Sequence, residues 1–506
     1  MGARLSSFSL SVVLGTVLTT VLGVAVVWPR FQLRQSMVDD WSAISMSPGQ
    51  VHDLVRLVYH ETGRFRPGFA SWNYLQWYTL DGPNGMIGPN IWAVARIALL
   101  AGGLVTFTAL ALQGRKALPP VWTFVLVLLP SVVVLSTPAF GVDLARFGPQ
   151  EPALVGGMTL GGSLIVLGMR IVAGSSRGLR AAALLVPGYV LWLYGVYQKE
   201  SAVCAFVLVP FLLLGAPDLK RRVHDLGGPR RHVLAVLAAA AVLPVLHVGW
   251  ESIKIRRQGD LIYGMDVQAK SKALTLFGDA LDKMSSALGS RIGWLLVGVV
   301  LVGIAVSAVR RRVDWLALGL FLTAGTALLW SAQSGFAASR YFMPTIALLA
   351  VAAALVIGSI GREALRIAAV AVLALPCVWS LAQTGARVGV EKWAAVERQE
   401  NRFVAAVRGE YRSGCPVVVS GLDAERTLAL PVLVKLDGGR RRTCAGSDFF
   451  LILNVAEPDT ALSGACAPGG GRSLGSWQLA LERVELRHCS WATPGSEPLL
   501  RMHRLT

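Results

Sequence analysis

The run FSLSVVLGTVLTTVLGVAVVW, residues 8–28, is predominantly apolar and long enough to cross a bilayer as one helix, for which about 20 residues are needed. It is followed by PRFQLRQSMVDDW, residues 29–41, in which two acidic residues, Asp39 and Asp40, are adjacent. Ionisable groups close to hydrocarbon lose hydration and are kept mainly for function. The acidic pair is therefore the first candidate for chemistry.

The composition is that of a membrane protein. Of the 506 residues, 54% are hydrophobic and only 15% are charged, whereas about 25% charged residues is usual in soluble domains. A soluble enzyme with one anchor is excluded. The net charge of +18 raises the question of nucleic acid, but most clustered positive residues lie in short loops between apolar runs, where membrane topology explains them. We expect a lipid bilayer as partner and no nucleic acid.

Apolar runs of bilayer-spanning length recur up to residue 384. The first has no small-residue cleavage site before Trp28 and Pro29, so we expect it to be retained as a helix. The sequence predicts eleven transmembrane helices, near residues 8–28, 90–112, 119–137, 152–173, 180–198, 200–216, 231–250, 291–309, 313–331, 340–360 and 365–384.

The loops between these helices indicate the orientation. With the N-terminus in the cytoplasm, every cytoplasmic loop carries Lys or Arg, as the positive-inside rule requires. We therefore expect a multi-pass protein of the cell membrane with a cytoplasmic N-terminus and an extracytoplasmic C-terminus. The basic residues of these loops are Arg115, Lys116, Arg170, Arg177, Arg180, Lys220, Arg221, Arg222, Arg230, Arg231, Arg310, Arg311, Arg312, Arg362 and Arg366.

The outer segments differ in kind from the cytoplasmic loops. The long first outer loop, 30–89, contains two stretches rich in Trp and Tyr, 49–62 and 68–80. They are expected to form short helices along the membrane interface. Further outer loops are predicted at 137–151, 199–200, 251–290 and 332–340.

From about residue 385 the pattern changes to that of a small α/β layer, in which strands alternate with helices. The predicted fold class is a polytopic α-helical membrane protein with about 11 transmembrane helices in residues 1–384 and a small extracytoplasmic α/β domain in residues 385–506. The expected elements of the second part are a helix at 391–412, strands at 415–422 and 448–455, a helix at 423–432, a Gly/Pro-rich loop at 467–476 and a last run at 477–486.

The six cysteines fall into two groups. Cys204 and Cys377 lie inside predicted helices, where a buried thiol is usual. The other four fit two disulfides in an oxidising compartment, with three possible pairings. A zinc site is the alternative, but no C-x-x-C spacing supports it. These four are Cys415, Cys444, Cys466 and Cys489.

Under this topology the unusual charges share the outer face. Paired carboxylates beside Arg and Lys are what a site needs in order to deprotonate one substrate while it holds a phosphate on another. The charges on this face are Asp39, Asp40, Arg64, Arg66, Asp143, Arg146, Glu151, Lys199, Glu200 and Arg340.

Each of these signals also has a structural interpretation. The Asp pair fits a solvated loop or a helix cap, and Lys199-Glu200 fits a wet hairpin between two helices. Arg340-Tyr341 fits an interfacial anchor, and Arg64 and Arg66 fit binding of lipid headgroups. The combination on one face is what favours a site.

The combination also resembles the GT-C superfamily of integral membrane glycosyltransferases that use polyprenyl-phosphate-linked sugars. The resemblance covers roughly residues 1–384. It rests on Asp39-Asp40-Trp41 after the first helix, Gly63-Arg64-Phe65-Arg66-Pro67 followed by Trp72, Trp77 and Tyr78, Lys199-Glu200, and Arg340-Tyr341 with Pro344.

The resemblance implies an inverting hexosyl or pentosyl transfer outside the membrane, from a polyprenyl-phosphate-sugar donor to a glycan, lipid or protein acceptor of the cell envelope. It implies Asp39 as general base, with Asp40 close behind, and Arg340 on the donor phosphate. The other residues expected to bind substrate are Arg64, Arg66, Glu151, Lys199, Glu200 and Tyr341.

No cofactor is required by this scheme, although two carboxylates are able to hold a divalent metal ion. One rival is a transporter or lipid flippase of envelope precursors, but transport sites lie near the bilayer midplane, usually with inverted repeats, and no repeat is visible. Another rival is a non-catalytic assembly protein that docks through residues 385–506, which leaves the one-sided charge unexplained.

Overall fold

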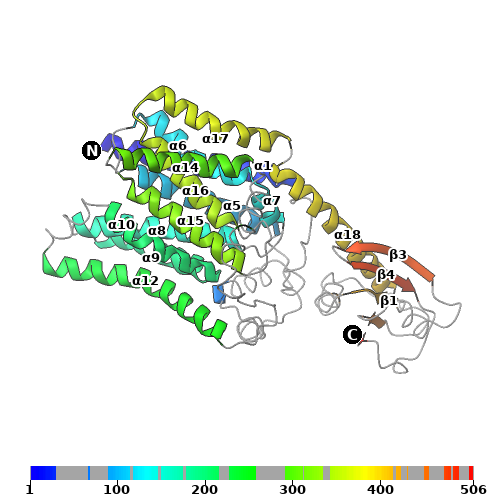
Figure 1. Ribbon diagram of the computed structural model, residues 1–506. Coiled ribbons are helices and arrows are strands. Elements are labelled where there is room, and N and C mark those ends of the chain that lie inside the picture. Colours follow the sequence, from blue (N-terminus) through cyan, green and yellow to red (C-terminus); the bar gives the residue numbers. More distant parts are fainter. Residues whose placement is uncertain are drawn as a thin grey trace.

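A computed structural model shows a bundle of helices followed by a small sheet (Figure 1). The residues that the structure describes are 2–29, 66–68, 89–113, 118–145, 150–174, 178–215, 227–257, 278, 291–310, 313–333, 342–383, 385–413, 417–422, 430, 450–454, 472–479, 482–488 and 501–504.

Within these residues, seven helices are long and apolar enough to cross a membrane, and four further apolar helices are shorter. Each coincides with one of the eleven predicted runs, so the predicted fold class is confirmed. The long helices are α1 (Gly2–Val26), α5 (Pro89–Leu112), α8 (Gln150–Gly174), α9 (Gly178–Val196), α12 (Gly228–Arg257), α14 (Arg291–Val309) and α17 (Glu363–Gln383). The shorter ones are α6 (Pro120–Leu135), η3 (Glu200–Val207) continued by α10 (Leu208–Gly215), α15 (Trp315–Gln333) and α16 (Met343–Gly358).

The sixth apolar run departs from a regular span, because it begins as the 3-10 helix η3 and becomes α-helical only at α10. A 3-10 helix rises about 2.0 Å per residue and an α-helix about 1.5 Å. Eight residues of each therefore cover roughly 28 Å, close to the roughly 30 Å of bilayer hydrocarbon. The larger rise per residue of the 3-10 helix η3 therefore lets this short run reach nearly across the hydrocarbon of the bilayer.

Two predicted outer loops are partly helical. Residues 137–151 contain the short helix α7 (Pro138–Ala145), and α12 extends to Arg257, into the loop predicted at 251–290. The two aromatic helices predicted at 49–62 and 68–80 lie outside the described residues, apart from Gly68.

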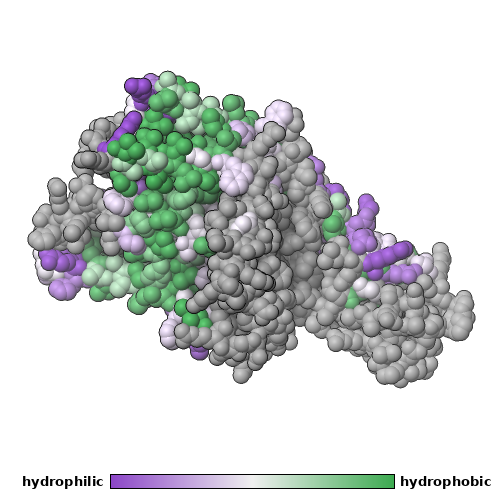
Figure 2. Space-filling view, viewed as in Figure 1, coloured by the Kyte–Doolittle hydropathy of each residue, from purple (hydrophilic) through white to green (hydrophobic). Residues whose placement is uncertain are grey.

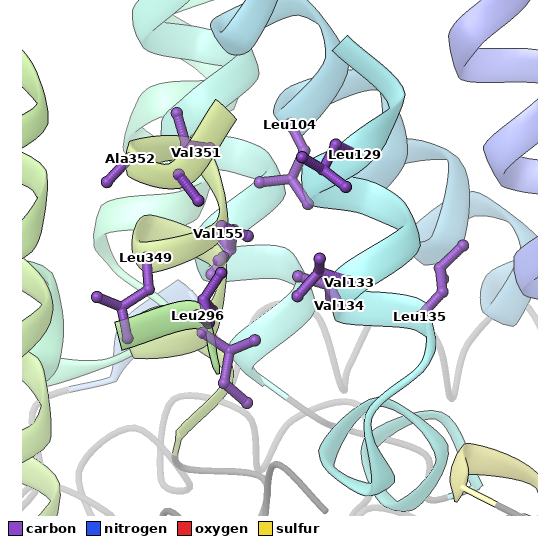
Figure 3. Packing of buried hydrophobic residues seen from close by; sticks show 14 of the residues in the cluster. Leu104, Leu129, Val133, Val134, Leu135, Val155, Leu296, Leu349, Val351 and Ala352 are labelled. Atoms are coloured by element: carbon purple, nitrogen blue, oxygen red, sulfur yellow. The ribbon is translucent and has the colours of Figure 1, made fainter. Parts of the chain in front are cut away.

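The helix α16 is the centre of the bundle. It contacts α5, α6, α8, α14, α15 and α17, and residues on all its faces are buried, as expected of a helix that is apolar all round. Figure 3 shows Leu349 and Val351 of this helix among Leu104, Val133 and Leu296 of its neighbours. This core fixes the framework to which the site residues are attached.

Glycines let three helices approach closely beside that core. A Cβ on Gly157 of α8 would lie 2.8 Å from the Cα of Gly195 in α9, and one on Gly156 would lie 2.7 Å from the backbone of Leu99 in α5. Small residues allow such backbone contact between membrane helices. The start of α8 is thus held against both α5 and the end of α9.

The outer flank of the bundle is apolar, as Figure 2 shows by its green band. Val17, Val236, Leu243, Val302 and Leu375 come from four helices, and each is more than 40% exposed. A continuous exposed apolar surface of this kind marks contact with lipid. The ion-paired residues discussed below lie at the ends of helices and in the first outer loop.

One end of the bundle, here called the α18 end, is where the chain passes to the C-terminal elements. There Gly23 near the end of α1 meets Ile97 near the start of α5 and Leu135 at the end of α6. The helix α18 (Gly385–Ser413) leaves from this end and contacts both α7 and strand β3 (Arg472–Leu479) (Figure 1). The predicted division into residues 1–384 and 385–506 stays a prediction.

The C-terminal part contains a five-stranded sheet in the order β3-β4-β1-β2-β5. Strands β1 and β2 are parallel and the other pairs are antiparallel. Trp477 of β3 packs on Phe403 of α18, with ring centroids 5.5 Å apart. The strands are β1 (Val417–Ser420), β2 (Phe450–Asn454), β3 (Arg472–Leu479), β4 (Glu482–His488) and β5 (Arg501–Arg504).

One prediction for this part was wrong in detail. Residues 472–476 of the predicted Gly/Pro-rich loop belong to β3, and the run 477–486 is divided between β3 and β4. The pairing of β3 with β4 shifts register between Ser473 and Gly475, a bulge that a glycine in a strand accommodates. Gly475 therefore lies in a strand with a bulge and not in a loop.

Candidate active site

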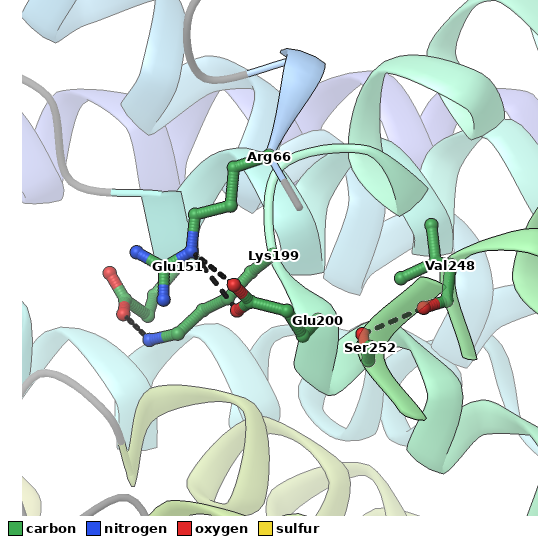
Figure 4. Close-up of polar contacts among 6 residues, drawn as sticks. All are labelled: Arg66, Glu151, Lys199, Glu200, Val248 and Ser252. Carbon is green, nitrogen blue, oxygen red and sulfur yellow. Dashed lines mark hydrogen bonds and ion pairs between the residues drawn. The ribbon is translucent and has the colours of Figure 1, made fainter. Parts of the chain in front are cut away.

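Four of the residues predicted to bind substrate, Arg66, Glu151, Lys199 and Glu200, come together in two ion pairs at the α18 end. They come from three segments: the first outer loop, the start of α8 and the turn between α9 and η3 (Figure 4). The remaining predicted site residues lie outside the described residues; these are Asp39, Asp40, Arg64, Arg340 and Tyr341.

The turn between α9 and η3 explains why Lys199 and Glu200 reach different partners. Lys199 has extended backbone angles, φ −158° and ψ 147°, whereas Glu200 is the first residue of η3. Adjacent residues in such different conformations direct their side chains apart. Lys199 therefore reaches α8, and Glu200 reaches the first outer loop.

The first ion pair joins Lys199 Nζ to Glu151 Oε1, and both side chains are buried, with 8% and 3% of their surface exposed. Glu151 lies in the first turn of α8, where the helix dipole favours a negative charge. The pair joins the start of α8 to the turn that follows α9.

The second ion pair joins Arg66 to Glu200. Arg66 Nε donates to both carboxylate oxygens of Glu200, at 2.8 and 3.0 Å, and the side chains are 9% and 11% exposed. Two residues later the backbone N–H of Gly68 donates to the carbonyl of Tyr197 at 3.0 Å. The end of the sequence Arg66-Pro67-Gly68 is thus fixed against the α9–η3 turn at two points.

Gly68 is required for this contact, because a Cβ there would lie 2.8 Å from the carbonyl oxygen of Tyr197. Its role was not predicted from the sequence. Its position directly after Arg66-Pro67 was the available signal, since glycine is the residue that allows a backbone to approach another backbone.

The burial of both pairs contradicts the interpretation of Lys199-Glu200 as a wet hairpin. Removing charges from water costs several kcal/mol per ion unless partners and hydrogen bonds compensate. Buried pairs that join three segments therefore indicate a constraint on local geometry. They hold one part of the first outer loop in place, and this loop also contains Asp39, Asp40 and Arg64.

Apolar contacts with α8 and α12 also support the turn between α9 and η3. Leu154, Val196, Ala202, Val245 and Val248 form a buried cluster between α8, α9, η3 and α12. In α12 the buried hydroxyl of Ser252 donates to the carbonyl of Val248 at 2.7 Å (Figure 4).

Aromatic side chains of α9 also bind α12. Tyr189 donates to the carbonyl of Leu237 at 2.5 Å, and Trp192 donates to that of Ala241 at 2.8 Å. Just past α9, the Tyr197 hydroxyl lies 3.0 Å from Nδ1 of His247. The turn is thus fixed from both the α8 side and the α12 side.

Arg96 is a further charged residue at this end that sequence reasoning missed. It lies in the apolar run of α5 and is only 3% exposed. It is one turn from Leu99, whose backbone touches Gly156 of α8. An arginine inside a membrane-spanning run is expensive and marks a functional site by default, so the signal was present in the sequence.

The described residues contain no group of three or more His, Cys, Asp or Glu side chains arranged to hold a metal ion. The expectation that catalysis needs no metal stays a prediction. Cys204 and Cys377 are buried inside helices, as predicted, and the four C-terminal cysteines lie outside the described residues.

No protein-family model matches the sequence, and no curated protein matches it. The fold, however, is similar to that of ArnT from Cupriavidus metallidurans. The structure of ArnT bound to undecaprenyl phosphate aligns with a TM-score of 0.50 and 12% identity over 96% of this chain and 99% of that one. This chain therefore shares the overall fold of that structure.

Two further structures align less closely. Apo ArnT aligns with a TM-score of 0.48 and 13% identity over 95% of this chain and 99% of that one. An oligosaccharyltransferase from Archaeoglobus fulgidus, solved in complex with Zn and sulfate, aligns with a TM-score of 0.44 and 13% identity over 78% of this chain and 56% of that one.

Proposed function

We propose that this protein transfers a hexose or pentose from a polyprenyl-phosphate-linked donor to a glycan, lipid or protein acceptor of the cell envelope, with inversion at the anomeric carbon. The observation that carries the proposal is the buried meeting of Arg66, Glu151, Lys199 and Glu200 at one end of the bundle. The fold adds support, since the similar ArnT structure holds undecaprenyl phosphate.

The chemistry needs few groups. A sugar joined to a lipid phosphate already carries a good leaving group, so catalysis requires a base for the acceptor hydroxyl and cations for the departing phosphate. In the proposed mechanism Asp39 takes the hydroxyl proton as the oxygen attacks the anomeric carbon, and Asp40 orients the acceptor. Arg340 holds the phosphate, with Arg64 beside it, because Lys199 is already paired with Glu151.

The two ion pairs serve this mechanism by positioning the first outer loop. Arg66 and Gly68 fix one part of that loop against the α9–η3 turn, and the turn is itself held to α8 by Lys199 and Glu151. Preorganised charges need no rearrangement during the reaction. We further propose that the α18 end faces the outside of the cell, as the positive loops predict.

A transporter or flippase is the alternative function. Transport sites lie near the bilayer midplane and are usually formed by broken helices. Here the two buried pairs lie at the starts of α8 and η3 and in the first outer loop, which are all at helix ends. The position of the pairs favours transfer at the membrane surface.

The test is sugar transfer by Asp39→Asn with Asp40→Asn as the matched control. Asparagine keeps the size of the side chain but removes its basicity, and general bases contribute about 10²–10⁴-fold. We expect Asp39→Asn to remain folded, to bind donor and to lose transfer by about this factor. If only Asp40→Asn loses transfer, the two roles are exchanged; full activity in both variants would refute the mechanism.

A further inference from the structure

Three uncharged polar residues flank the two ion pairs along the chain. Gln150 precedes Glu151, Gln198 precedes Lys199, and Ser201 follows Glu200. All three are buried, with 8%, 1% and 9% of their surface exposed. They therefore lie beside the charged residues at the start of α8 and at the α9–η3 turn.

Each of these residues has a buried polar atom that lacks a hydrogen-bond partner among the described residues: Gln150 Oε1, Gln198 Nε2 and Ser201 Oγ. Buried polar side-chain atoms in folded proteins nearly always have partners, so each exception needs an explanation. Three exceptions within one residue of the same ion pairs indicate that another molecule supplies the partners.

The chemistry of the three atoms defines that molecule. Oε1 of Gln150 accepts a hydrogen bond, Nε2 of Gln198 donates one, and a serine hydroxyl does both. A phosphate diester offers only acceptor oxygens, so it cannot donate a hydrogen bond to Oε1 of Gln150 and would be repelled by that oxygen. A sugar hydroxyl both donates and accepts, and it satisfies an amide in either orientation.

The neighbouring charges favour the same ligand. Arg66 and Lys199 each already face a carboxylate, and the formal charges of the four residues cancel. An added anion would be buried beside two carboxylates, which is costly. A neutral ring that bears several hydroxyls meets no such penalty.

We propose that Gln150, Gln198 and Ser201 bind hydroxyl groups of the sugar ring of the lipid-linked donor, and that the phosphate binds elsewhere. This inference rests on the proposed function. The donor fits better than an acceptor because the three residues are buried among membrane helices, where a lipid-linked sugar arrives with its lipid. A buried water molecule would also satisfy these atoms, but it would not make sugar affinity depend on them.

The experiment measures binding of four lipids to the full-length protein in nanodiscs: undecaprenyl phosphate, and undecaprenyl phosphate linked to glucose, mannose or arabinose. The variants are Gln198→Leu, Gln150→Leu and Ser201→Ala. The matched control is Ser131→Ala in α6, because Ser131 is also buried, at 2% exposure, and its Oγ also lacks a partner in the described part of the chain.

We expect the wild type to bind one sugar-bearing lipid more tightly than undecaprenyl phosphate. Each of the three variants should weaken that binding by about tenfold, the usual effect of one lost hydrogen bond, and leave binding of undecaprenyl phosphate unchanged. Ser131→Ala should change neither affinity. Since leucine or alanine removes a buried group without a partner, the variants should not unfold more readily than the wild type, and Ser201→Ala gives the same readout if a Gln→Leu variant fails to fold.

Two results would overturn the inference in different ways. If the wild type binds a sugar-bearing lipid preferentially and the three variants bind it equally well, or weaken both kinds of lipid alike, the sugar site is wrong and the proposed function survives. If the wild type binds none of the four lipids, the proposed function fails and the sugar site fails with it.

Discussion

At the α18 end of the bundle, two ion pairs are buried, whereas at the opposite end the contact between Arg170 and Gln113 is exposed to solvent. The pairs Arg66–Glu200 and Lys199–Glu151 have side chains that are at most 11% exposed. At the opposite end the guanidinium of Arg170 donates to Gln113 at 3.1 Å, and this contact is exposed. Exposed charges there are explained by membrane orientation, while buried pairs constrain how loops meet.

The two ends also differ in which segments of the chain their polar contacts join. At the opposite end, Trp122 of α6 donates weakly to Glu363 of α17 at 3.4 Å, again in an exposed contact. Arg366 is buried there, but its guanidinium has no carboxylate partner among the contacts that the structure describes: it donates to the backbone carbonyl of Ile360 and lies 5.3 Å from the Trp122 ring centroid. The contacts of Trp122 join two helices that already pack together. At the α18 end the pairs join a loop, a helix start and a turn that the helical core does not place by itself.

The largest expected effect on stability comes from breaking one buried pair. Lys199→Met leaves the Glu151 carboxylate buried without its cation, and such changes destabilise by about 3–5 kcal/mol. The matched control at the opposite end is Arg170→Met, which removes an exposed contact worth at most about 1 kcal/mol. Thermal unfolding of both variants in detergent, followed by tryptophan fluorescence, measures the difference.

A second variant distinguishes charge burial from general damage to the packing. Lys199→Met combined with Glu151→Leu removes both charges and should recover much of the lost stability, because apolar replacement of a whole buried pair is often neutral. Equal stability losses in Lys199→Met and Arg170→Met would remove the distinction between the two ends.

The next effect concerns the C-terminal part beyond the α18 end. We expect Cys415, Cys444, Cys466 and Cys489 to form two disulfides, each contributing about 2–4 kcal/mol. Mass analysis without reductant should show no free thiol among the four. A membrane-impermeant thiol reagent should label them in intact cells only after reduction. Four free thiols or bound zinc would reject the disulfides, and lack of labelling after reduction would place this part in the cytoplasm.

A smaller effect is expected at Arg340, which we propose holds the donor phosphate. Lysine keeps the positive charge but loses the planar fork that binds two phosphate oxygens. Arg340→Lys should therefore weaken binding of undecaprenyl phosphate by about tenfold with unchanged thermal stability. Unchanged lipid binding in Arg340→Ala would assign this residue to membrane anchoring.

The framework was predictable from the sequence because bilayer thickness fixes the length of an apolar run, and each predicted run corresponds to a helix. The 3-10 start of the sixth run could not be predicted, because no residue between Glu200 and Val207 distinguishes a 3-10 helix from an α-helix. Strand β3 was missed because its glycine marks a bulge and was interpreted as a loop.

The site was predictable as a set of charges but not as pairs. Lys199 and Glu151 are 48 positions apart, and Arg66 and Glu200 are 134 apart. Which cation faces which carboxylate depends on how α8, α9 and the first outer loop pack, and this packing is set by glycine contacts such as Gly157 with Gly195. The charge pattern predicted that these charged residues lie at one end of the bundle. The packing of the helices determines which cation pairs with which carboxylate.

We propose that the α18 end of the bundle receives a lipid-linked phosphosugar. The most direct measurement is an experimental density map of the purified full-length protein with undecaprenyl phosphate. We predict density for the lipid phosphate at the α18 end, next to Arg340 and on the same side of the membrane as the pair of Arg66 and Glu200. Phosphate density at the end that carries Arg170 and Glu363, or near the middle of the helices as in a transporter, would contradict the account.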